Sequence, residues 1–511
     1  MGSRSLMCIT AMTLFAALAI QVRPRLAAQE QQQNKQQPQY KLIDLGTFGG
    51  PSSYFIFTGL VLNNHGVAAG TADTSIPDPY APNCFSPECL VTHAFQWQDG
   101  VLTDLGALPG VNGSVPSDIN ASGVIAGISE NGMVDPTAPF PPEYHGVVWK
   151  DGQIIDLGTF GGNWSYANTI NDHGEVAGFA LNATPDSFGL GNLCFNSPGF
   201  PTQMRASVWQ HGKLRNLGTL GGPDSCGLFI NQQGEVAGHS FTNSTVNPVT
   251  GFPTTHPFLW TGSRMVDLHT LGGTLALAAA INNRTEVVGL SNLAGDLTFH
   301  PFLWKKGTLT DLGTLGGNNG QANWLNDAGE IVGKADLPGP LPQTHDAFLW
   351  KNGVMTDLGT QDGDPCSNAL YISARGQIVG GSSDCTNFLH AFLSDNGGPL
   401  IDLNSFVPAG SNLTLTEATF INGRGEIGVQ AVLPNGDQHA VVLIPCEGDD
   451  DGCQGENPVS VSQNNRPQAT QRSTTVTPAN PARGDRGLMD RLRARRFPGL
   501  RTLGPGTGPT N

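Results

Sequence analysis

The chain has 511 residues, of which only 13% are charged, and its formal net charge is -16. An excess of acidic side chains repels phosphate backbones, so the composition argues against nucleic acid as a partner. Glycine (67 residues) and proline (36 residues) are frequent, and hydrophobic residues make up 38%. This combination is typical of many short strands joined by turns and not of a disordered chain.

The first 28 residues have the three parts of a secretory signal peptide. Arg4 supplies the positive start, Cys8–Ile20 the apolar run, and Leu26–Ala28 a cleavage site with small residues. The apolar run is too short to span a bilayer and no later stretch approaches its length, so no membrane span is expected. We therefore predict secretion to the extracellular space or periplasm. Residues 29–39 are rich in glutamine and are predicted to be a linker.

From residue 40 to residue 445 the sequence repeats one pattern eight times. Each copy has an Asp-Leu-Gly-Thr-x-Gly-Gly turn, a strand ending in Ile-Asn, a Gly-Glu-Val-Ala-Gly strand, a variable loop and a His-Ala-Phe-Leu-Trp strand. The clearest copies are 300–314 and 346–360. In the second of these, the Asn352-Gly353 turn between two apolar runs is a strong hairpin signal. Four short strands in roughly 40–50 residues is the size of one propeller blade.

The two ends of the repeat region predict how it closes. The region begins with an outer-type strand, 40–45, and ends with an unaccompanied third-type strand, 439–444. Pairing them would complete the last blade and leave no open edge. The sequence therefore predicts an all-β fold, a β-propeller of eight four-stranded blades over residues 40–445, closed by the N-terminal strand. A seven-bladed ring with one divergent unit outside it is the alternative.

This pattern resembles the bacterial extracellular HAF repeat family, named after the His-Ala-Phe motif seen here at 93–95 and 390–392. The resemblance covers residues 41–445. It implies a secreted repeat protein and no particular activity, because the family is defined by its repeat. Arg205 and Asp346 depart from the pattern at the histidine position, and Ser394 and Leu443 depart from it at the tryptophan position.

Histidine and aspartate recur at fixed hairpin positions and are the first candidates for catalysis or metal binding. Pairing around Asn352 puts Phe348 opposite Asp357, with position 346 diagonal to Asp357 on the same face. A contact repeated in most copies indicates a clamp between strands, whereas catalysis needs one site with asymmetric surroundings. We therefore assign the repeated residues to the architecture: His93, His145, His256, His300, His390, His439, Asp104, Asp156, Asp311 and Asp357.

The variable loops are where the copies differ. They are long in the first four copies (71–92, 128–144, 179–204 and 239–255) and roughly half that length in the last four. Long insertions on one face of a repeat array usually mark its binding face, although a tolerated insertion without function is the alternative. The predicted ligand contacts on these loops are Tyr80, Phe85, Phe140, Tyr144, Phe188, Phe195, Phe200 and Phe252. Trp164 and Trp324 lie off the repeated tryptophan position and are predicted either as further contacts or as core residues.

Eight of the nine cysteines remain after removal of the signal, an even number in an oxidising compartment, so disulfides are expected. The predicted pairs are Cys84 with Cys89, Cys194 with Cys226, Cys366 with Cys385, and Cys446 with Cys453. Residues 446–453 form an acidic loop, and residues 454–511 lack apolar periodicity and are predicted to be disordered. No paired Cys-x-x-Cys spacing is present, so the sequence predicts no metal site and no cofactor.

These features favour a monomeric recognition or scaffold protein that binds an extracellular carbohydrate or polypeptide through its loops. An extracellular propeller hydrolase or lyase with carboxylates in a central channel is the alternative. Asp118, Asp172 and Asp327 are its candidate residues, although each also sits in an ordinary turn, and such an enzyme should show paired carboxylates with raised pKa values. No nucleophile elbow, phosphate loop or dinucleotide fingerprint is present, so the sequence leans against an enzyme. A passive cell-surface repeat is the third hypothesis.

Overall fold

The computed structural model describes residues 39–446, apart from 56–58, 82–83, 85, 87, 135–141, 187, 189–193, 195–199, 341–342 and 362. The predicted signal peptide, almost all of the glutamine-rich linker, the acidic loop after Cys446 and the C-terminal tail lie outside the described residues. So do Phe85, Phe140, Phe195 and Cys453. Within the described residues, no helix has the length and apolar character needed to cross a membrane.

The described part of the chain is all-β, as predicted, apart from the short 3-10 helix η1 (Leu403–Phe406). We call each group of four antiparallel strands a unit. Units 1 and 2 contain β2 (Gly49–Tyr54), β3 (Ala68–Pro77), β4 (Leu90–Gln98), β5 (Val101–Gly106), β6 (Ser114–Ile119), β7 (Ile125–Val134), β8 (Pro142–Lys150) and β9 (Gln153–Asp156). Units 3 and 4 contain β10 (Gly161–Ile170), β11 (Val176–Pro185), β12 (Thr202–Gln210), β13 (Lys213–Asn216), β14 (Ser225–Ile230), β15 (Val236–Val246), β16 (Pro253–Trp260) and β17 (Met265–Asp267).

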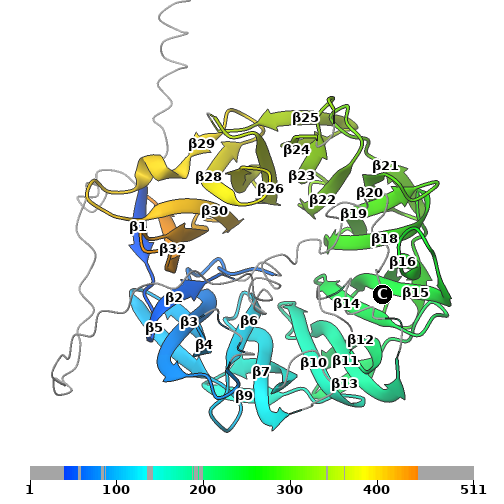
Figure 1. Ribbon diagram of the computed structural model, residues 1–511, viewed down its shortest axis with the longest axis horizontal. Coiled ribbons are helices and arrows are strands. Elements are labelled where there is room, and N and C mark those ends of the chain that lie inside the picture. Colours follow the sequence, from blue (N-terminus) through cyan, green and yellow to red (C-terminus); the bar gives the residue numbers. More distant parts are fainter. Residues whose placement is uncertain are drawn as a thin grey trace, which may run out of the picture.

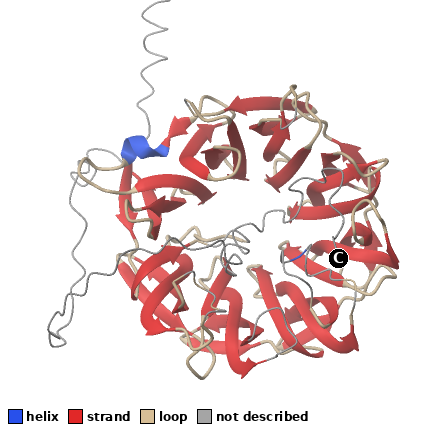
Figure 2. Ribbon diagram, viewed as in Figure 1, coloured by secondary structure: helices blue, strands red, loops and turns tan. Residues whose placement is uncertain are grey.

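Units 5 and 6 contain β18 (Gly272–Ile281), β19 (Glu286–Leu293), β20 (Phe299–Lys305), β21 (Thr308–Asp311), β22 (Gly320–Leu325), β23 (Ile331–Asp336), β24 (His345–Lys351) and β25 (Val354–Gly359). Units 7 and 8 contain β26 (Cys366–Ile372), β27 (Gln377–Ser383), β28 (Phe388–Asp395), β29 (Ile401–Asp402), β30 (Thr414–Ile421), β31 (Ile427–Val432), β32 (Gln438–Pro445) and β1 (Tyr40–Asp44). The units lie side by side around a common axis, with the first strand of each unit innermost (Figures 1 and 2). This is the arrangement of a β-propeller.

Strands within a unit pair antiparallel in chain order, with one exception at the chain ends. Strand β1 pairs with β32, so that Tyr40 lies opposite Pro445 and Asp44 opposite Val441. The first strand of the chain is thus the fourth strand of the last unit. Units 4 and 5 are in addition joined by a parallel bridge between Thr255 and Leu275.

The third and fourth strands of a unit are joined by tight hairpins whose chemistry the sequence dictates. Asn352 and Gly353 both have positive φ (53° and 85°), as a type I′ turn requires. The twist of this turn matches that of the strands, which fixes the register. Phe348 accordingly lies opposite Asp357.

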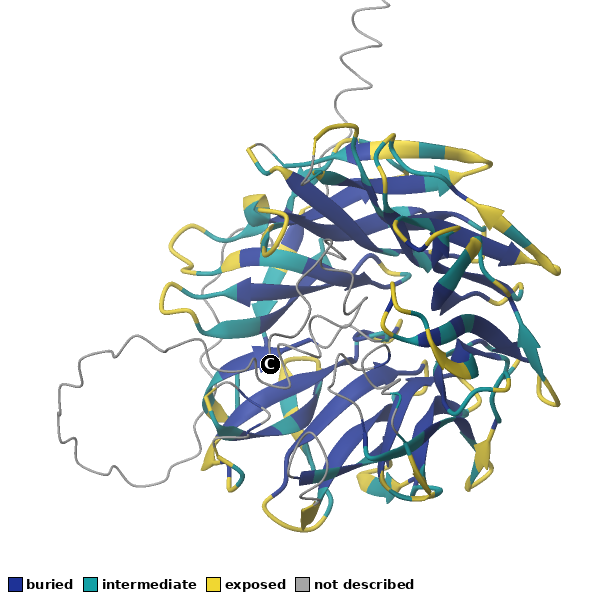
Figure 3. Ribbon diagram, turned by 45° about the vertical axis from the view of Figure 1, so that its right-hand side comes forward, coloured by how far each residue is buried: buried dark blue, intermediate teal, exposed yellow. Residues whose placement is uncertain are grey.

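The core lies between neighbouring units, where the phenylalanines of the repeated His-Ala-Phe strand are fully buried. Phe348 of unit 6, for example, packs in one cluster with Ala280, Val288 and Leu303 of unit 5. Figure 3 shows buried strand centres and exposed turns and loop ends. Because each sheet buries its faces only against its neighbours, no unit is expected to be stable alone.

A repeated asparagine fastens the turns between the first and second strands. Its side-chain Nδ2 donates to the backbone carbonyl at the same position of the next unit, over 2.9–3.2 Å. The donors are Asn63, Asn120, Asn171, Asn231, Asn282, Asn326 and Asn422, and the bond from Asn422 reaches Asn63 across the chain ends. In unit 7 the position is Ser373, which has no side-chain amide to donate.

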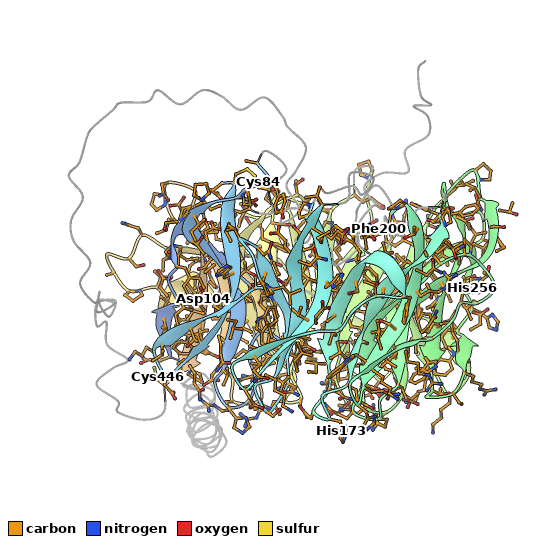
Figure 4. The ribbon with its side chains drawn as sticks, turned by 90° about the horizontal axis from the view of Figure 1, so that it is seen from below. Cys84, Asp104, His173, Phe200, His256 and Cys446 are labelled. Atoms are coloured by element: carbon orange, nitrogen blue, oxygen red, sulfur yellow. A yellow bond between two sulfur atoms is a disulfide. The ribbon has the colours of Figure 1, made fainter. Side chains whose placement is uncertain are left out.

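The molecule has two faces, which we name by their connections. The turn face carries the repeated asparagine turns and the tight hairpins. The loop face carries the variable loops between second and third strands, together with the connections between units. Figure 4 shows Cys84 and Phe200 at the loop face and His173 at the turn face, with Asp104 and His256 between them.

Candidate functional site

The loop face differs between the first and last four units. The second strands β3, β7, β11 and β15 have 10 or 11 residues, whereas β19, β23, β27 and β31 have 6 to 8. After a bulge, the longer strands pair again with the third strand, for example at Val134–Pro142 and Val246–Pro253. Units 1–4 therefore carry hairpins that extend beyond their sheets on the loop face.

Three of the aromatic residues that the sequence predicted as ligand contacts are core residues. Tyr144, Trp164 and Phe200 are buried, Trp164 to only 3% exposure. The ring centre of Trp164 lies 4.7 Å from that of Tyr144 and 5.0 Å from that of Phe200. Their rings pack on one another because the long loops fold back onto the inner strands. Trp164 thus takes the core position that was one of its two predicted roles, and Tyr144 and Phe200 are buried beside it.

Two other predicted aromatic contacts lie at the edge of the same cluster. They are Phe188 and Phe252, which are partly buried against it. Tyr80 is half-buried elsewhere. Burial raises the pKa of the Tyr80 hydroxyl, and the charges of Glu130 and Asp78 raise it further. Trp324 belongs to unit 6 and packs against a different cluster. Among the described residues, the predicted contacts therefore do not form one exposed aromatic surface.

Disulfides hold the loops in place. Cys84 joins Cys89 within the loop of unit 1, and Cys194 in the loop of unit 3 joins Cys226 on β14 of unit 4. Cys366 joins Cys385 in unit 7. Cys446 is also disulfide-bonded, at the edge of the described residues. The second of these bonds ties a long loop to the neighbouring unit.

Exposed large apolar side chains gather on the loop face. Of the ten such side chains among the described residues, eight lie there, and the other two, Val101 and Val354, lie on hairpins of the turn face. The eight are Ile76, Val111, Met133, Val134, Val246, Val249, Leu297 and Leu389, and Met133 is 61% exposed. Six of them belong to units 1–4 or their connections. Exposed apolar side chains grouped on one face are typical of an interaction surface.

A buried carboxyl group anchors the hairpin of unit 2. Glu130 accepts hydrogen bonds from the backbone N–H of Gly113 (2.6 Å) and from the Tyr144 hydroxyl (2.9 Å). Burial raises the pKa of Glu130 to about 7, against the lowering effect of these two bonds. The group ties the extended hairpin to the connection before unit 2.

The repeated histidines and aspartates form clamps between the third and fourth strands. In five pairs the histidine Nδ1 lies 2.8–2.9 Å from the carboxylate. The pairs are His93–Asp104, His145–Asp156, His256–Asp267, His300–Asp311 and His439–Asp44. The last pair joins the two ends of the chain. Five near-identical pairs argue for a structural role, because a catalytic site needs surroundings of its own.

Three units depart from this clamp. In unit 3, Arg205 takes the place of the histidine and Asn216 that of the aspartate. His390 bonds to Asp364 (2.7 Å) and not to the repeat aspartate Asp402, whose carboxylate instead accepts the backbone N–H of Asn404 at the start of η1. In unit 6, Asp346 takes the place of histidine beside Asp357. Burial and the neighbouring Asp357 raise the pKa of Asp346 to about 7, which favours one shared proton between the two carboxyl groups.

The carboxylates that the sequence suggested for a central channel accept hydrogen bonds from neighbouring units. Asp118 is buried and accepts the backbone N–H groups of Leu60 and Ile170, from the units on either side. Burial raises its pKa to about 7 despite these bonds. Asp172 accepts the N–H of Ala121, and Asp327 accepts that of Asn283. Their oxygens thus fasten the turns between units.

Close to the axis, units 4, 6, 7 and 8 bring aromatic rings together. Trp324 lies 4.8 Å from Tyr371, which lies 4.3 Å from Phe420. Trp324 also meets Phe229 of unit 4, at 6.5 Å, past Ala280 of the intervening unit. All five residues stand two positions before the repeated asparagine or Ser373, where the inner strand has a bulge. This set was not predicted, although its shared spacing is visible in the sequence.

Comparison with known proteins adds similarities of overall form. No family model and no curated protein matches the chain. Among solved structures, it is similar to the β-propeller domain of the Trilobed protease from Pyrococcus furiosus (10% identity, 61% of this chain and 85% of that one, TM-score 0.36). It is also similar to TolB from Acinetobacter baumannii (11% identity, 64% and 81%, TM-score 0.30) and to the polysaccharide lyase Uly1 (7% identity, 78% and 90%, TM-score 0.33).

Proposed function

We propose that residues 40–445 are an eight-bladed β-propeller of the HAF repeat type, closed by pairing of β1 with β32. Three contacts that recur between neighbouring strands or units also join the chain ends, and they support this closure. They are the Asn422–Asn63 amide bond, the His439–Asp44 clamp, and the bond from the Ala440 N–H to the Ser53 hydroxyl. Deletion of 40–46 should expose an edge of β32 and lower the free energy of unfolding by several kcal/mol. An unchanged melting temperature would contradict the closure.

The protein is further proposed to be secreted and to bind an extracellular polypeptide through the loop face of units 1–4. The observation that carries this function is the exposed apolar side chains on the projecting hairpins of that face. The disulfides support an oxidising compartment. The extended hairpins hold the apolar side chains in fixed positions, which lowers the entropy lost on binding.

The chemistry of this surface favours a polypeptide over a carbohydrate. Sugar rings are recognised by stacking on exposed aromatic faces, whereas Tyr144, Trp164 and Phe200 are buried. The exposed side chains are aliphatic or thioether groups such as Ile76, Met133 and Val246. Methionine and branched aliphatic side chains adapt to the apolar side chains of a protein partner.

A binding assay with two matched variants tests this function. The full chain, a loop-face variant (Met133→Ser, Val134→Ser, Val246→Ser, Val249→Ser) and a turn-face control (Val101→Ser, Val354→Ser) are compared on a peptide array and a glycan array. All six positions are exposed, so both variants should fold. We expect the wild type and the control to bind peptides and the loop-face variant to lose at least tenfold in affinity.

Other results would reject the proposal. Peptide binding that persists in the loop-face variant would move the site elsewhere on the molecule. Glycan binding without peptide binding would favour the carbohydrate alternative. Binding of neither array by the wild type would favour the passive scaffold.

A further inference from the structure

Unit 4 departs from the repeat at one exposed position next to its clamp. In the other units with a His–Asp clamp, the aspartate is followed by Leu-Gly, whereas in unit 4 it is followed by Leu268 and His269. The side chain of His269 is 75% exposed. None of the other described clamps has a histidine two residues after its aspartate.

The two histidines of unit 4 meet at one carboxylate. His256 Nδ1 lies 2.9 and 3.0 Å from the two oxygens of Asp267, and His269 Nδ1 lies 3.4 Å from one of them. The imidazole rings are 6.0 Å apart and nearly perpendicular. One nitrogen of each histidine and one carboxylate oxygen all lie within 4.8 Å of one another. The three side chains thus converge on one point at the side of the molecule, near His256 in Figure 4.

His269 occupies a backbone conformation that suits glycine. Its φ is +64°, and at the same position Gly46, Gly106, Gly158 and Gly313 have φ between +65° and +75°. The N–H of His269 donates to Asp267 over 2.7 Å, as the N–H of Gly313 does to Asp311 over 2.8 Å. A side chain in this left-handed conformation is strained, and such strain often accompanies a functional role.

We infer that His256, Asp267 and His269 bind a divalent transition-metal ion such as Zn²⁺. Two imidazole nitrogens and a carboxylate oxygen are a common ligand set for this class of ion. Ligands at zinc's usual bond lengths in tetrahedral geometry lie about 3.4 Å from one another, close to the separations around Asp267. The ion takes the place of the proton on His256 Nδ1, and the neutral ring then carries its proton on Nε2.

The charge and exposure of the three ligands fit this role. An aspartate carboxylate is ionised at neutral pH, so Asp267 supplies an anionic ligand. The side chains of His256 and Asp267 are 18% and 30% exposed, so the site opens to solvent and leaves a fourth position for water. The inference is independent of the loop face and its partner.

Zinc titration of the untagged full chain tests the site. Isothermal titration calorimetry should show one ion bound per chain, with Ca²⁺ and Mg²⁺ not bound at the same concentrations. His269→Gly should abolish this binding and, because it relieves the strained φ, raise the melting temperature of the metal-free chain by about 1–2 °C. His300→Ala, which removes a clamp histidine without a third ligand, should leave the stoichiometry at one.

Building the same three ligands into another unit gives a test in which misfolding cannot imitate the expected result. Gly313→His adds the missing histidine to the His300–Asp311 clamp and should raise the stoichiometry from one to two. Zinc binding unchanged in His269→Gly, no binding by the wild type at 100-fold excess of Zn²⁺, or a Gly313→His chain that still binds one ion would each overturn the inference.

Discussion

Units 1–4 and units 5–8 share one repeat but fasten their neighbours differently. In the first half, long loops fold back and bury Tyr144, Trp164 and Phe200, and the Cys194–Cys226 bond joins two units. In the second half, loops are short and Trp324 and Tyr371 meet near the axis. The difference shows that long insertions need their own core. Most described aromatic residues of the loops serve that core, which leaves the aliphatic side chains outside it for a partner.

The largest expected effect is on the free energy of unfolding, and it differs between the two tryptophans outside the repeated tryptophan position. Trp164→Ala should lower the free energy of unfolding by about 4 kcal/mol, because it leaves a cavity in a buried cluster. Trp324→Ala should cost about 2 kcal/mol, because this side chain is only half-buried. Denaturant unfolding measures both values. If both variants lost the same free energy of unfolding, the cluster around Trp164 would be no better packed than the aromatic contacts of Trp324 near the axis.

Loss of a disulfide should come next. Replacing Cys194 and Cys226 by serine should cost about 3–4 kcal/mol, because the bond closes a segment with a sequence separation of 32. The matched control is serine at Cys84 and Cys89, whose separation of 5 predicts a loss of about 2 kcal/mol. Thermal unfolding without reductant compares the variants, and a larger loss in the control would contradict the loop-closure argument.

A smaller effect is expected from restoring the clamp of unit 6. The pKa of Asp346 is about 7 in the fold and about 4 in an unfolded chain, so the folded chain holds the extra proton between these values. Stability from this pair is therefore largest below pH 4 and falls as pH rises to 7. Asp346→His should raise the free energy of unfolding at pH 8 by about 1–2 kcal/mol.

Unfolding measured from pH 4 to pH 8 checks this expectation. The wild type should lose stability relative to Asp346→His as pH rises. The reverse substitution in unit 5, His300→Asp, should create the same loss there. Parallel pH profiles for Asp346→His and the wild type would show that the carboxyl pair holds no extra proton.

The smallest effect concerns the asparagine hydrogen bonds of the turn face. Ser373→Asn should add the amide donor that unit 7 lacks and stabilise the fold by about 0.5–1 kcal/mol. Asn282→Ser, which removes such a donor between units 5 and 6, should destabilise it by about 1 kcal/mol or more. A Ser373→Asn variant less stable than the wild type would mean that the serine is needed for its own bonds to Arg375 and Gln377.

Periodicity and turn chemistry make the strands and their register predictable from sequence. The all-β fold follows from them, as does the facing of Phe348 and Asp357. The long loops lack periodicity, and an aromatic residue such as Phe200 has the same sequence signal whether it faces solvent or core. Their burial was therefore not predictable.

At other positions, a competing local interaction overrides the contact that the repeat pattern predicts. Asp402 follows the repeat, yet its carboxylate caps η1, so His390 bonds to Asp364. The axis contacts of Trp324 depend on a bulge, which the sequence marks only by spacing. The proposed metal site was not predicted, because His256 and Asp267 follow the repeated clamp and only His269, in place of a glycine, distinguishes them.

The missing amide at Ser373 bears on where the chain could be cut. The chain ends are joined by the same Asn422–Asn63 bond that links other neighbours, whereas units 7 and 8 are continuous in sequence but lack its counterpart. A circular permutant that joins residue 445 to residue 40 and opens between η1 and β30 would place the new termini at this junction. This permutant opens the chain between units 7 and 8, where the asparagine hydrogen bond that joins the other neighbouring units is absent.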